Sequence, residues 1–220
     1  MPARAIIFDC DGVLVDSEVI YLEVERALLA QIGLRYDPVD YKERFIGLTM
    51  PDYFAALRSD FSKWGEGTFP EDFEHQVISQ SMARIESELQ TISGVEDVLH
   101  AFDGAKAVAS SSQIDKLHKK LEITGLHHHF NPHIYSGDDV ENGKPAPDLF
   151  LHAAAQIGHA PGNCIAIEDS ANGVRSAVAA GMTVWGFTGG GHADDGLSQR
   201  LMAAGAHEVF GSFAEVGASL

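Results

Sequence analysis

Two carboxylates stand two positions apart in the segment Asp9-Cys10-Asp11-Gly12, directly after the short apolar run Ala5–Phe8. At the end of a buried strand, such carboxylates repel each other and are costly to desolvate. A cation would offset that cost, and hard oxygen ligands without a dedicated cage suit Mg²⁺. Gly12 allows a tight turn, so that a main-chain carbonyl could join the site. The alternative interpretation is an acidic capping loop after a strand.

A second acidic pair, Glu168-Asp169, ends the apolar run Ile165–Ile167. These side chains could extend the carboxylate site of the first pair. Alternatively, Asp169 or the following Ser170 could cap a helix. The sequence therefore offers two acidic pairs, each at the end of a predicted strand.

Two further segments could bind a phosphate group. Ser110, Ser111 and Ser112 follow the apolar run Ala107–Ala109, and hydroxyl and backbone N–H groups at a strand end can cradle a phosphate or cap a helix. Lys144 precedes Pro145, which keeps it out of the helical region and in a loop. There it could pair with an anion or remain a solvated surface charge.

Short apolar runs alternate with helical patterns over most of the chain. The runs lie at 5–8, 105–109, 133–135, 164–167, 183–187 and 208–210. Helices are expected from Pro147 to Gly158 and over 170–180, before Gly181. This alternation predicts an α/β fold, a doubly wound, Rossmann-like core with a parallel sheet. The four polar segments should then converge at the carboxyl ends of the strands.

Residues 17–89 break this alternation, because they contain no convincing strand. Apolar residues recur there at helical spacing, over 22–32, 53–57 and 73–82. We therefore predict an all-helical cap domain at 17–89, inserted into a core domain made of 1–16 and 90–220. An insert directly after the first strand would sit over the crevice where open α/β sheets bind ligands.

Composition narrows the function classes. The 220 residues are 45% hydrophobic and 21% charged, which is typical of a globular protein. Asp and Glu number 32 against 15 Lys and Arg, and the resulting net charge of −17 disfavours a nucleic-acid partner. No apolar run approaches the roughly 18 residues of a membrane span. The two distant cysteines, Cys10 and Cys164, and the lack of a signal-like N-terminus favour the cytoplasm.

Together these motifs resemble the haloacid dehalogenase-type phosphatase superfamily, over essentially the whole chain. Its four motifs occur here in order: Asp-x-Asp-Gly at 9–12, a serine at 110, a lone lysine at 144 and an acidic pair at 168–169. The helical insert resembles the small cap of that superfamily. The segments around motifs one, three and four are most similar to the β-phosphoglucomutase and sugar-phosphate phosphatase branch. Ser87–Leu89 and Gly162–Ile165 also resemble bacterial 6-phosphogluconate phosphatases.

The resemblance implies a role for each motif residue. Asp9 would attack phosphorus and form an aspartyl-phosphate, while Asp11 would protonate the leaving alkoxide and then deprotonate water. Ser110, Ser111 and Lys144 would hold the phosphate oxygens. The resemblance also implies a Mg²⁺ site, made by Asp9, the main-chain carbonyl of Asp11, Asp169 and the nearby Glu168.

Substrate recognition is expected from the cap segment 47–52, with Arg44, Thr49 and Met50 as candidate substrate-reading residues. Alternatively this segment is a helix entry with Thr49 as its cap. In β-phosphoglucomutases the loop carries an arginine where this chain has Met50, and an assisting histidine where it has Tyr21. A mutase needs two phosphate sites, so these departures favour hydrolysis over a phosphotransferase reaction.

A receiver-like phospho-acceptor module is the alternative from a different class of protein. Receivers lack a helical insert after the first strand and carry their acceptor on the third strand, which here ends in Ser136-Gly137. The sequence therefore favours an enzyme over a receiver module.

Taken together, these features predict a cytoplasmic, Mg²⁺-dependent phosphatase. Its expected partner is a small phosphorylated metabolite, a sugar, polyol or sugar-acid phosphate such as 6-phosphogluconate.

Overall fold

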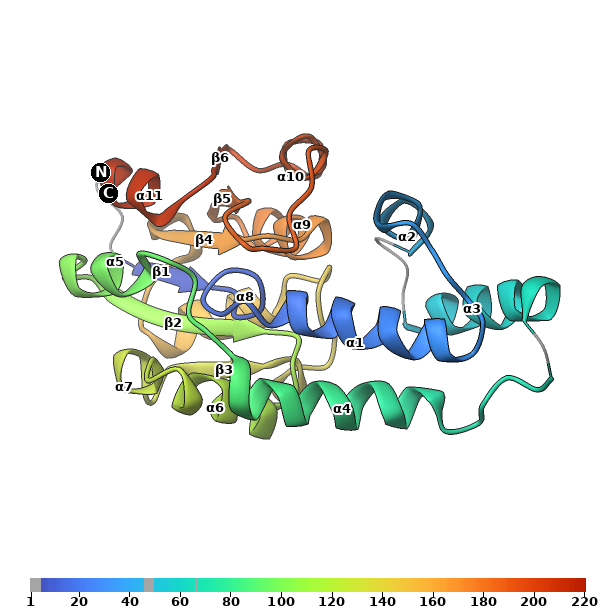
Figure 1. The fold of residues 1–220 in the computed structure, drawn as a ribbon. Helices are drawn as coiled ribbons and strands as arrows, with labels where there is room; N and C mark the ends of the chain where they lie inside the picture. The colour runs from blue at the N-terminus through green and yellow to red at the C-terminus, as the bar shows by residue number, and fades with distance from the viewer. Residues whose placement is uncertain (1–4, 46–49, 66) are drawn as a thin grey trace. The chain divides into compact units, whose positions relative to one another are not determined.

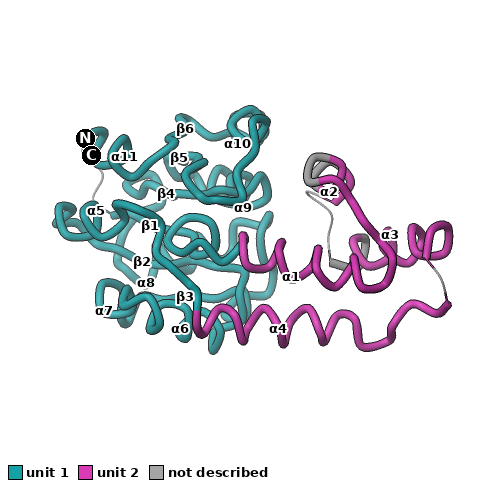
Figure 2. Tube along the Cα trace, viewed as in Figure 1, with its two compact units in different colours: residues 1–18, 88–220 teal, residues 19–87 magenta. Residues whose placement is uncertain are grey.

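The computed structural model describes residues 5–45, 50–65 and 67–220, and at 38, 39, 42, 43 and 50–52 it describes the backbone only. The chain divides into two compact units (Figure 2). One comprises Met1–Glu18 with Glu88–Leu220 and is called the core unit below; the other, Val19–Ser87, is called the helical unit.

The core unit is built on a six-stranded parallel sheet with the order β3-β2-β1-β4-β5-β6 (Figure 1). Its strands are β1 (Ala5–Phe8), β2 (Ala105–Ser110), β3 (Ile134–Ser136), β4 (Cys164–Glu168), β5 (Thr183–Phe187) and β6 (Glu208–Phe210). The central strands β1 and β4 are buried along their whole length, as continuously apolar sequences of parallel sheets usually are.

The register of the central strands decides where the polar segments meet. Phe8 of β1 pairs with Val108 of β2 on one side and with Ile167 of β4 on the other. The next residue of each strand therefore lies at the same level, at the carboxyl edge of the sheet. Asp9 follows β1 at this edge, between Ala109 and Glu168.

Helices cover both faces of this sheet, as expected for a doubly wound core. They are α5 (Val95–Ala101), α6 (Ile114–Ile123), α7 (His127–Phe130), α8 (Asp148–Gln156), α9 (Ala171–Ala179), α10 (Leu197–Ala204) and α11 (Phe213–Ser219), with short 3₁₀ turns at Gly137–Asp139 and Pro161–Asn163.

Alternate side chains of the strands pack on opposite faces. Ile7 belongs to the apolar cluster with α8, α9 and α10, whereas the ring of Phe8 packs against Phe130 of α7 with centroids 5.7 Å apart. On that second face Phe187 meets Phe213 of α11 at 4.7 Å. The predicted α/β class is thus confirmed.

The helical unit contains most of α1 (Ser17–Gln31) and α4 (Phe73–Glu88), and all of α2 (Pro38–Phe45) and α3 (Met50–Trp64). Its interior is aromatic, with Tyr41, Phe45, Tyr53 and Phe54 joined in successive ring contacts. Residues 47–49 of the predicted substrate loop 47–52 lie outside the described residues, and 50–52 form the first turn of α3. Among the described helices, none is both long and apolar enough to cross a bilayer.

Candidate active site

Lys144 connects the strand ends of the core unit. Its ammonium donates to Asp9 Oδ1 and Glu168 Oε1, both at 2.6 Å, and to the carbonyl of Ala109 at 2.8 Å. Its side chain is only 5% exposed. Burial lowers the pKa of Lys144, but the carboxylates of Asp9 and Glu168 outweigh burial and raise it. The lysine therefore stays charged and links three neighbouring strands.

Glu168 is fully buried, and its second oxygen is held by the start of α9. Ser170 donates to Glu168 Oε2 from its backbone N at 3.1 Å and from its hydroxyl at 3.0 Å. A Cβ at Gly173 would collide with the carboxylate of Glu168. The glycine in the first turn of α9 therefore makes the room that this carboxylate needs.

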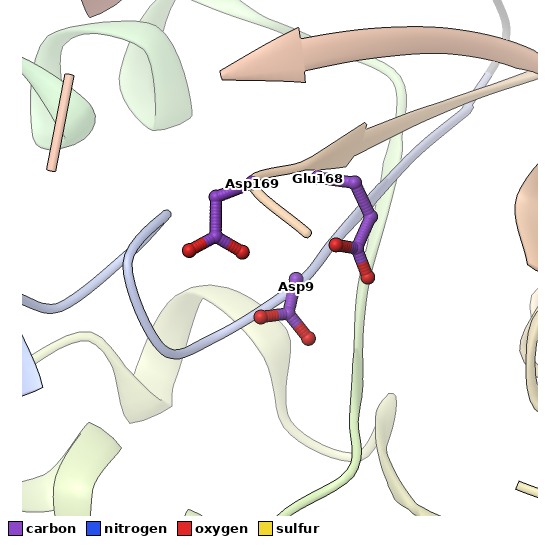
Figure 3. Close-up of side chains that lie close together, drawn as sticks. All are labelled: Asp9, Glu168 and Asp169. Carbon is purple, nitrogen blue, oxygen red and sulfur yellow. The ribbon is translucent and has the colours of Figure 1, made fainter. Parts of the chain in front are cut away.

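Asp9, Glu168 and Asp169 bring three buried carboxylates together (Figure 3). One oxygen from each lies within 4.8 Å of the others. Burial raises the pKa of Asp9 well above its ordinary value, and the neighbouring carboxylates raise it further although Lys144 lowers it. The pKa of Asp169 is raised for the same reasons. One lysine does not balance three carboxylates, and an all-oxygen donor set of this kind fits a hard divalent cation.

Gly12 lets the first motif turn next to this cluster. Its φ of +76° is in the left-handed region, which favours glycine. A Cβ at this position would also overlap the Asp169 carboxylate and the ring of His192. Glycine is thus required twice here, by the backbone and by the close approach of the acidic side chain.

Asp11 is held by Ser112 and by two residues that the sequence analysis did not single out, Ser17 and Lys120. Ser17 and Lys120 both donate to Asp11 Oδ1, and Ser112 donates to Oδ2 at 2.8 Å. Burial alone would raise the pKa of Asp11, but the charge and hydrogen bond of Lys120, with the two serine hydroxyls, lower it. Asp11 is therefore an anion with both carboxylate oxygens bound.

The serines after β2 differ in their surroundings. Ser110 is buried, and its Oγ accepts a hydrogen bond from the backbone N of Ser112 at 3.1 Å. Ser111 is exposed at the start of the following turn. The phosphate-binding roles expected of Ser110 and Ser111 stay predictions.

Two more titratable groups adjoin the cluster and were missed from the sequence. His192 Nε2 lies 3.0 Å from Asp169 Oδ2. Burial, together with the charges of Asp11 and Asp169, raises the pKa of Glu18 to about 8. The loop of His192 is tied to the first motif, because Gly191 N donates to Asp16 Oδ1 at 3.0 Å. In the sequence, the run Gly189–Gly191 directly before His192 marks this loop.

Arg44, predicted to read the substrate, is bound to a carboxylate within the helical unit. Its guanidinium contacts both oxygens of Asp60, at 3.1 and 3.2 Å. Asp60 is 1% exposed, whereas the side chain of Arg44 is 45% exposed. Thr49 lies outside the described residues, and for Met50 only the backbone is described. The substrate-reading roles of all three residues stay predictions.

The sequence of this chain is similar to those of known proteins. A family model described as haloacid dehalogenase-like hydrolase matches residues 3–181. The chain is 30% identical over 189 residues to the 6-phosphogluconate phosphatase of Escherichia coli strain K12, which covers 86% of this chain and 84% of that protein.

Two solved structures are similar over nearly the whole chain. A haloacid dehalogenase-like protein of unknown function from Agrobacterium tumefaciens strain C58 has a TM-score of 0.91 at 36% identity, covering 99% of this chain and 97% of that one. A HAD family hydrolase from Deinococcus radiodurans R1, with bound phosphate and sodium, has a TM-score of 0.84 at 34% identity and coverages of 99% and 95%.

Proposed function

The chain belongs to the haloacid dehalogenase-like hydrolase family, and from this premise we propose that it is a Mg²⁺-dependent phosphatase that works through an aspartyl-phosphate. The family expected from the motifs is thereby confirmed. So is the enzyme class, phosphoric monoester hydrolase, because sequence relatives from Escherichia coli are named as 6-phosphogluconate phosphatase, hexitol phosphatase and fructose-1-phosphate phosphatase. The metal, the intermediate and the residue roles below are our proposal.

The observation that carries this proposal is the arrangement at the carboxyl edge of the sheet. Asp9 stands at the end of the central strand, with Lys144 bound to one of its oxygens and the carboxylate of Asp169 beside it. A nucleophilic carboxylate, a fixed cation and an acidic metal-binding cluster are the groups that phosphoryl transfer requires.

In the first half-reaction we assign the nucleophile to Asp9. A carboxylate oxygen of Asp9 forms a bond to phosphorus, and the bond from phosphorus to the ester oxygen breaks. The leaving alkoxide takes its proton from the carboxyl group of Asp11. Asp11 is ionised in the structure, and the negative charge of a bound phosphate ester would raise its pKa and favour the protonated form.

In the second half-reaction Asp11, now a carboxylate, accepts a proton from water. The water oxygen attacks phosphorus, and the bond between phosphorus and Asp9 breaks. Inorganic phosphate leaves, and the Asp9 carboxylate is regenerated. Dividing hydrolysis in this way replaces one difficult displacement by two easier ones.

Neutralising charge is the task of the remaining groups. A Mg²⁺ ion held by Asp9, Asp169 and the Asp11 carbonyl, with Glu168 nearby, would let a carboxylate approach a phosphate dianion without prohibitive repulsion. Lys144 and the hydroxyl of Ser110 would bind the remaining phosphate oxygens. Because the net charge of the protein is −17, local cations must attract the substrate rather than the overall field.

The helical unit would act as the cap that selects the leaving group, and Arg44, Thr49 and Met50 remain the proposed specificity residues. Asp60 would hold the half-exposed Arg44 in a fixed orientation. The expected substrate is a small sugar, polyol or sugar-acid phosphate, with 6-phosphogluconate the first to try because a relative is named for it. The proposed location is the cytoplasm, which suits two distant cysteine thiols.

The experiment is a phosphate-release assay on a panel containing 6-phosphogluconate, hexitol phosphates, fructose 1-phosphate and 4-nitrophenyl phosphate. The enzyme is first stripped with a chelator and then assayed with and without added Mg²⁺. We expect release that depends on Mg²⁺, and none from an Asp9→Asn preparation made in parallel. Hydrolysis that persists in the stripped enzyme, or that is equal in the variant, would contradict the proposal.

A further inference from the structure

Lys120 is a buried lysine that the reaction described above does not use. It lies on α6, where its exposed fraction is 1% while the next residue along the chain toward the N-terminus, Lys119, is exposed. It shares the buried side of the helix with Leu117 and Leu121. An ammonium group in such a place is costly unless a charged partner compensates it. Its partner therefore indicates why the lysine is there.

That partner is Asp11. Lys120 Nζ donates to Asp11 Oδ1, and it also contacts the hydroxyl of Ser112 at 3.1 Å. Ser112 in turn donates to Asp11 Oδ2 at 2.8 Å, while Ser17 donates to Oδ1. Both oxygens of the Asp11 carboxylate thus accept hydrogen bonds, from groups in three separate segments of the core unit.

Lys144 and Lys120 each bind a different aspartate of the first motif. Lys144 binds Asp9 and Glu168, and Lys120 binds Asp11. An ion pair buried only to support the fold is seldom more stable than apolar side chains of the same volume. A lysine on an otherwise apolar stripe, aimed at one particular carboxylate of the motif, instead suggests that the orientation of that carboxylate matters.

We propose that Lys120 is a positioning residue for Asp11, which it holds, with Ser112, at the place where a leaving group must be protonated. This inference rests on the proposed function. With Oδ1 bound by an ammonium group, the proton that Asp11 gives to the leaving alkoxide is carried by Oδ2. The same oxygen then takes the proton from water in the second half-reaction, so the proton balance is unchanged. In this proposal Lys120 acts through Asp11 and has no contact with the substrate of its own.

A substrate whose leaving group needs no proton separates the positioning of Asp11 by Lys120 from other effects of replacing the lysine. An alkoxide is a poor leaving group and depends on Asp11, whereas 4-nitrophenolate leaves without protonation. Because kcat/KM covers only the steps up to departure of the first product, it reports leaving-group protonation and excludes the later attack of water. A loss of Asp11 positioning should therefore lower kcat/KM for an alkyl phosphate much more than for 4-nitrophenyl phosphate.

The test compares Lys120→Met with Lys119→Met, which makes the same change one residue away on the exposed side of α6. The substrates are 4-nitrophenyl phosphate and the alkyl phosphate that the panel ranks first. We expect Lys120→Met to lower kcat/KM about 100-fold for the alkyl ester, in the range of general acid catalysis, but less than about fivefold for the aryl ester. Lys119→Met should change both less than about twofold.

Ser112→Ala keeps the inference testable if Lys120→Met does not fold. It removes only a hydroxyl, and we expect a loss of roughly tenfold for the alkyl ester with the aryl ester nearly unchanged. Equal losses for both esters in the folded variants, or no loss for either, would overturn the positioning role. Failure of the proposed function is recognised separately, because the wild-type enzyme would then hydrolyse neither ester.

Discussion

Each of the two units buries an acidic side chain against cations, and the charge balance differs between them. In the helical unit Asp60 accepts both arms of Arg44 and the hydroxyl of Tyr36, with Lys63 3.8 Å away. In the core unit Lys144 faces Asp9 and Glu168, with Asp169 alongside. Asp60 is one acid beside two cationic side chains, whereas the three acids of the core unit have one lysine, with Ser170 donating to Glu168 and His192 beside Asp169.

The pKa values follow this balance. Burial would raise the pKa of Asp60, but the hydrogen bonds from Arg44 and Tyr36 lower it. The pKa of Asp9 is raised by burial and by neighbouring carboxylates, although Lys144 opposes them. A compensated carboxylate holds its own unit together, while an undercompensated cluster retains the capacity to bind a cation and to react.

The largest effect should come from Asp9→Asn, measured beside Asp60→Asn. An amide cannot serve as the nucleophile, so phosphatase activity should fall by on the order of 10³ or more. The melting temperature of Asp9→Asn should not fall, because this substitution neutralises one of three crowded carboxylates. Asp60→Asn should behave in the opposite way, with a clearly lower melting temperature. If Asp9→Asn keeps activity within threefold of wild type, the assignment of Asp9 is wrong.

Removing Lys144 should destabilise the core unit, because its clustered carboxylates would lose their shared cation. Lys144→Met leaves Asp9 and Glu168 without their shared cation, and we expect a loss of about 3–5 kcal/mol of unfolding free energy at pH 7 without metal. The folded-state pKa of Asp9, which is already raised, would then lie still further above its unfolded value. Protonation of Asp9 therefore stabilises the variant as the pH falls.

Urea denaturation from pH 7 to pH 5 measures this prediction. The deficit of Lys144→Met relative to wild type should shrink across that range, since the lysine itself stays charged throughout. Added Mg²⁺ should shrink it as well. A deficit that is constant with pH and metal would mean that the carboxylates are not crowded.

The contribution of Asp60 to stability should change in a different pH range. The pKa of Asp60 is lowered in the folded protein, so its contribution to stability is present above the unfolded pKa of about 3.9 and is lost as the pH falls through the folded value. The advantage of wild type over Asp60→Asn should thus stay constant from pH 7 to pH 5 and decline only below about pH 4. A decline already between pH 7 and pH 5 would contradict this contrast.

A smaller effect is expected from Glu25, which bonds to the hydroxyl of Tyr41 at 2.5 Å. Burial raises the pKa of Glu25 even though the tyrosine hydrogen bonds lower it. The ionised form is therefore disfavoured by folding, and wild type should gain stability relative to Glu25→Gln as the pH falls. Thermal melts at pH 7 and pH 5 decide the sign of this difference.

Much of the candidate site could be predicted because parallel strands bring their carboxyl ends to one edge. The acids after two apolar runs and the lysine before a proline identified Asp9, Asp11, Lys144, Glu168 and Asp169 without any three-dimensional information. Their proximity follows from the strand register, which places Asp9 and Glu168 at one level. Local patterns were sufficient for this part of the molecule.

Lys120 and Asp60 show what local patterns could not supply. Each carries a charge on an apolar helical stripe, between Leu117 and Leu121 in one case and between Leu57 and Phe61 in the other. A charge at such spacing signals a buried ion pair, yet it does not name the partner. Lys120 and Asp11 are 109 residues apart in the chain, so only the folded structure identifies the pair.

The central claim, that Asp9 accepts the phosphoryl group, is tested most directly by trapping the intermediate. An Asp11→Asn variant, which lacks the base for the second half-reaction, is mixed with 4-nitrophenyl phosphate and Mg²⁺, quenched in acid and digested with pepsin at acid pH, where an acyl phosphate survives. We predict one added phosphoryl group on the peptide that contains Asp9, located at Asp9 by fragmentation and absent when Asp9 is also replaced by Asn. An unmodified peptide from an enzyme that has released 4-nitrophenol, or a phosphoryl group on any other residue, would contradict the account.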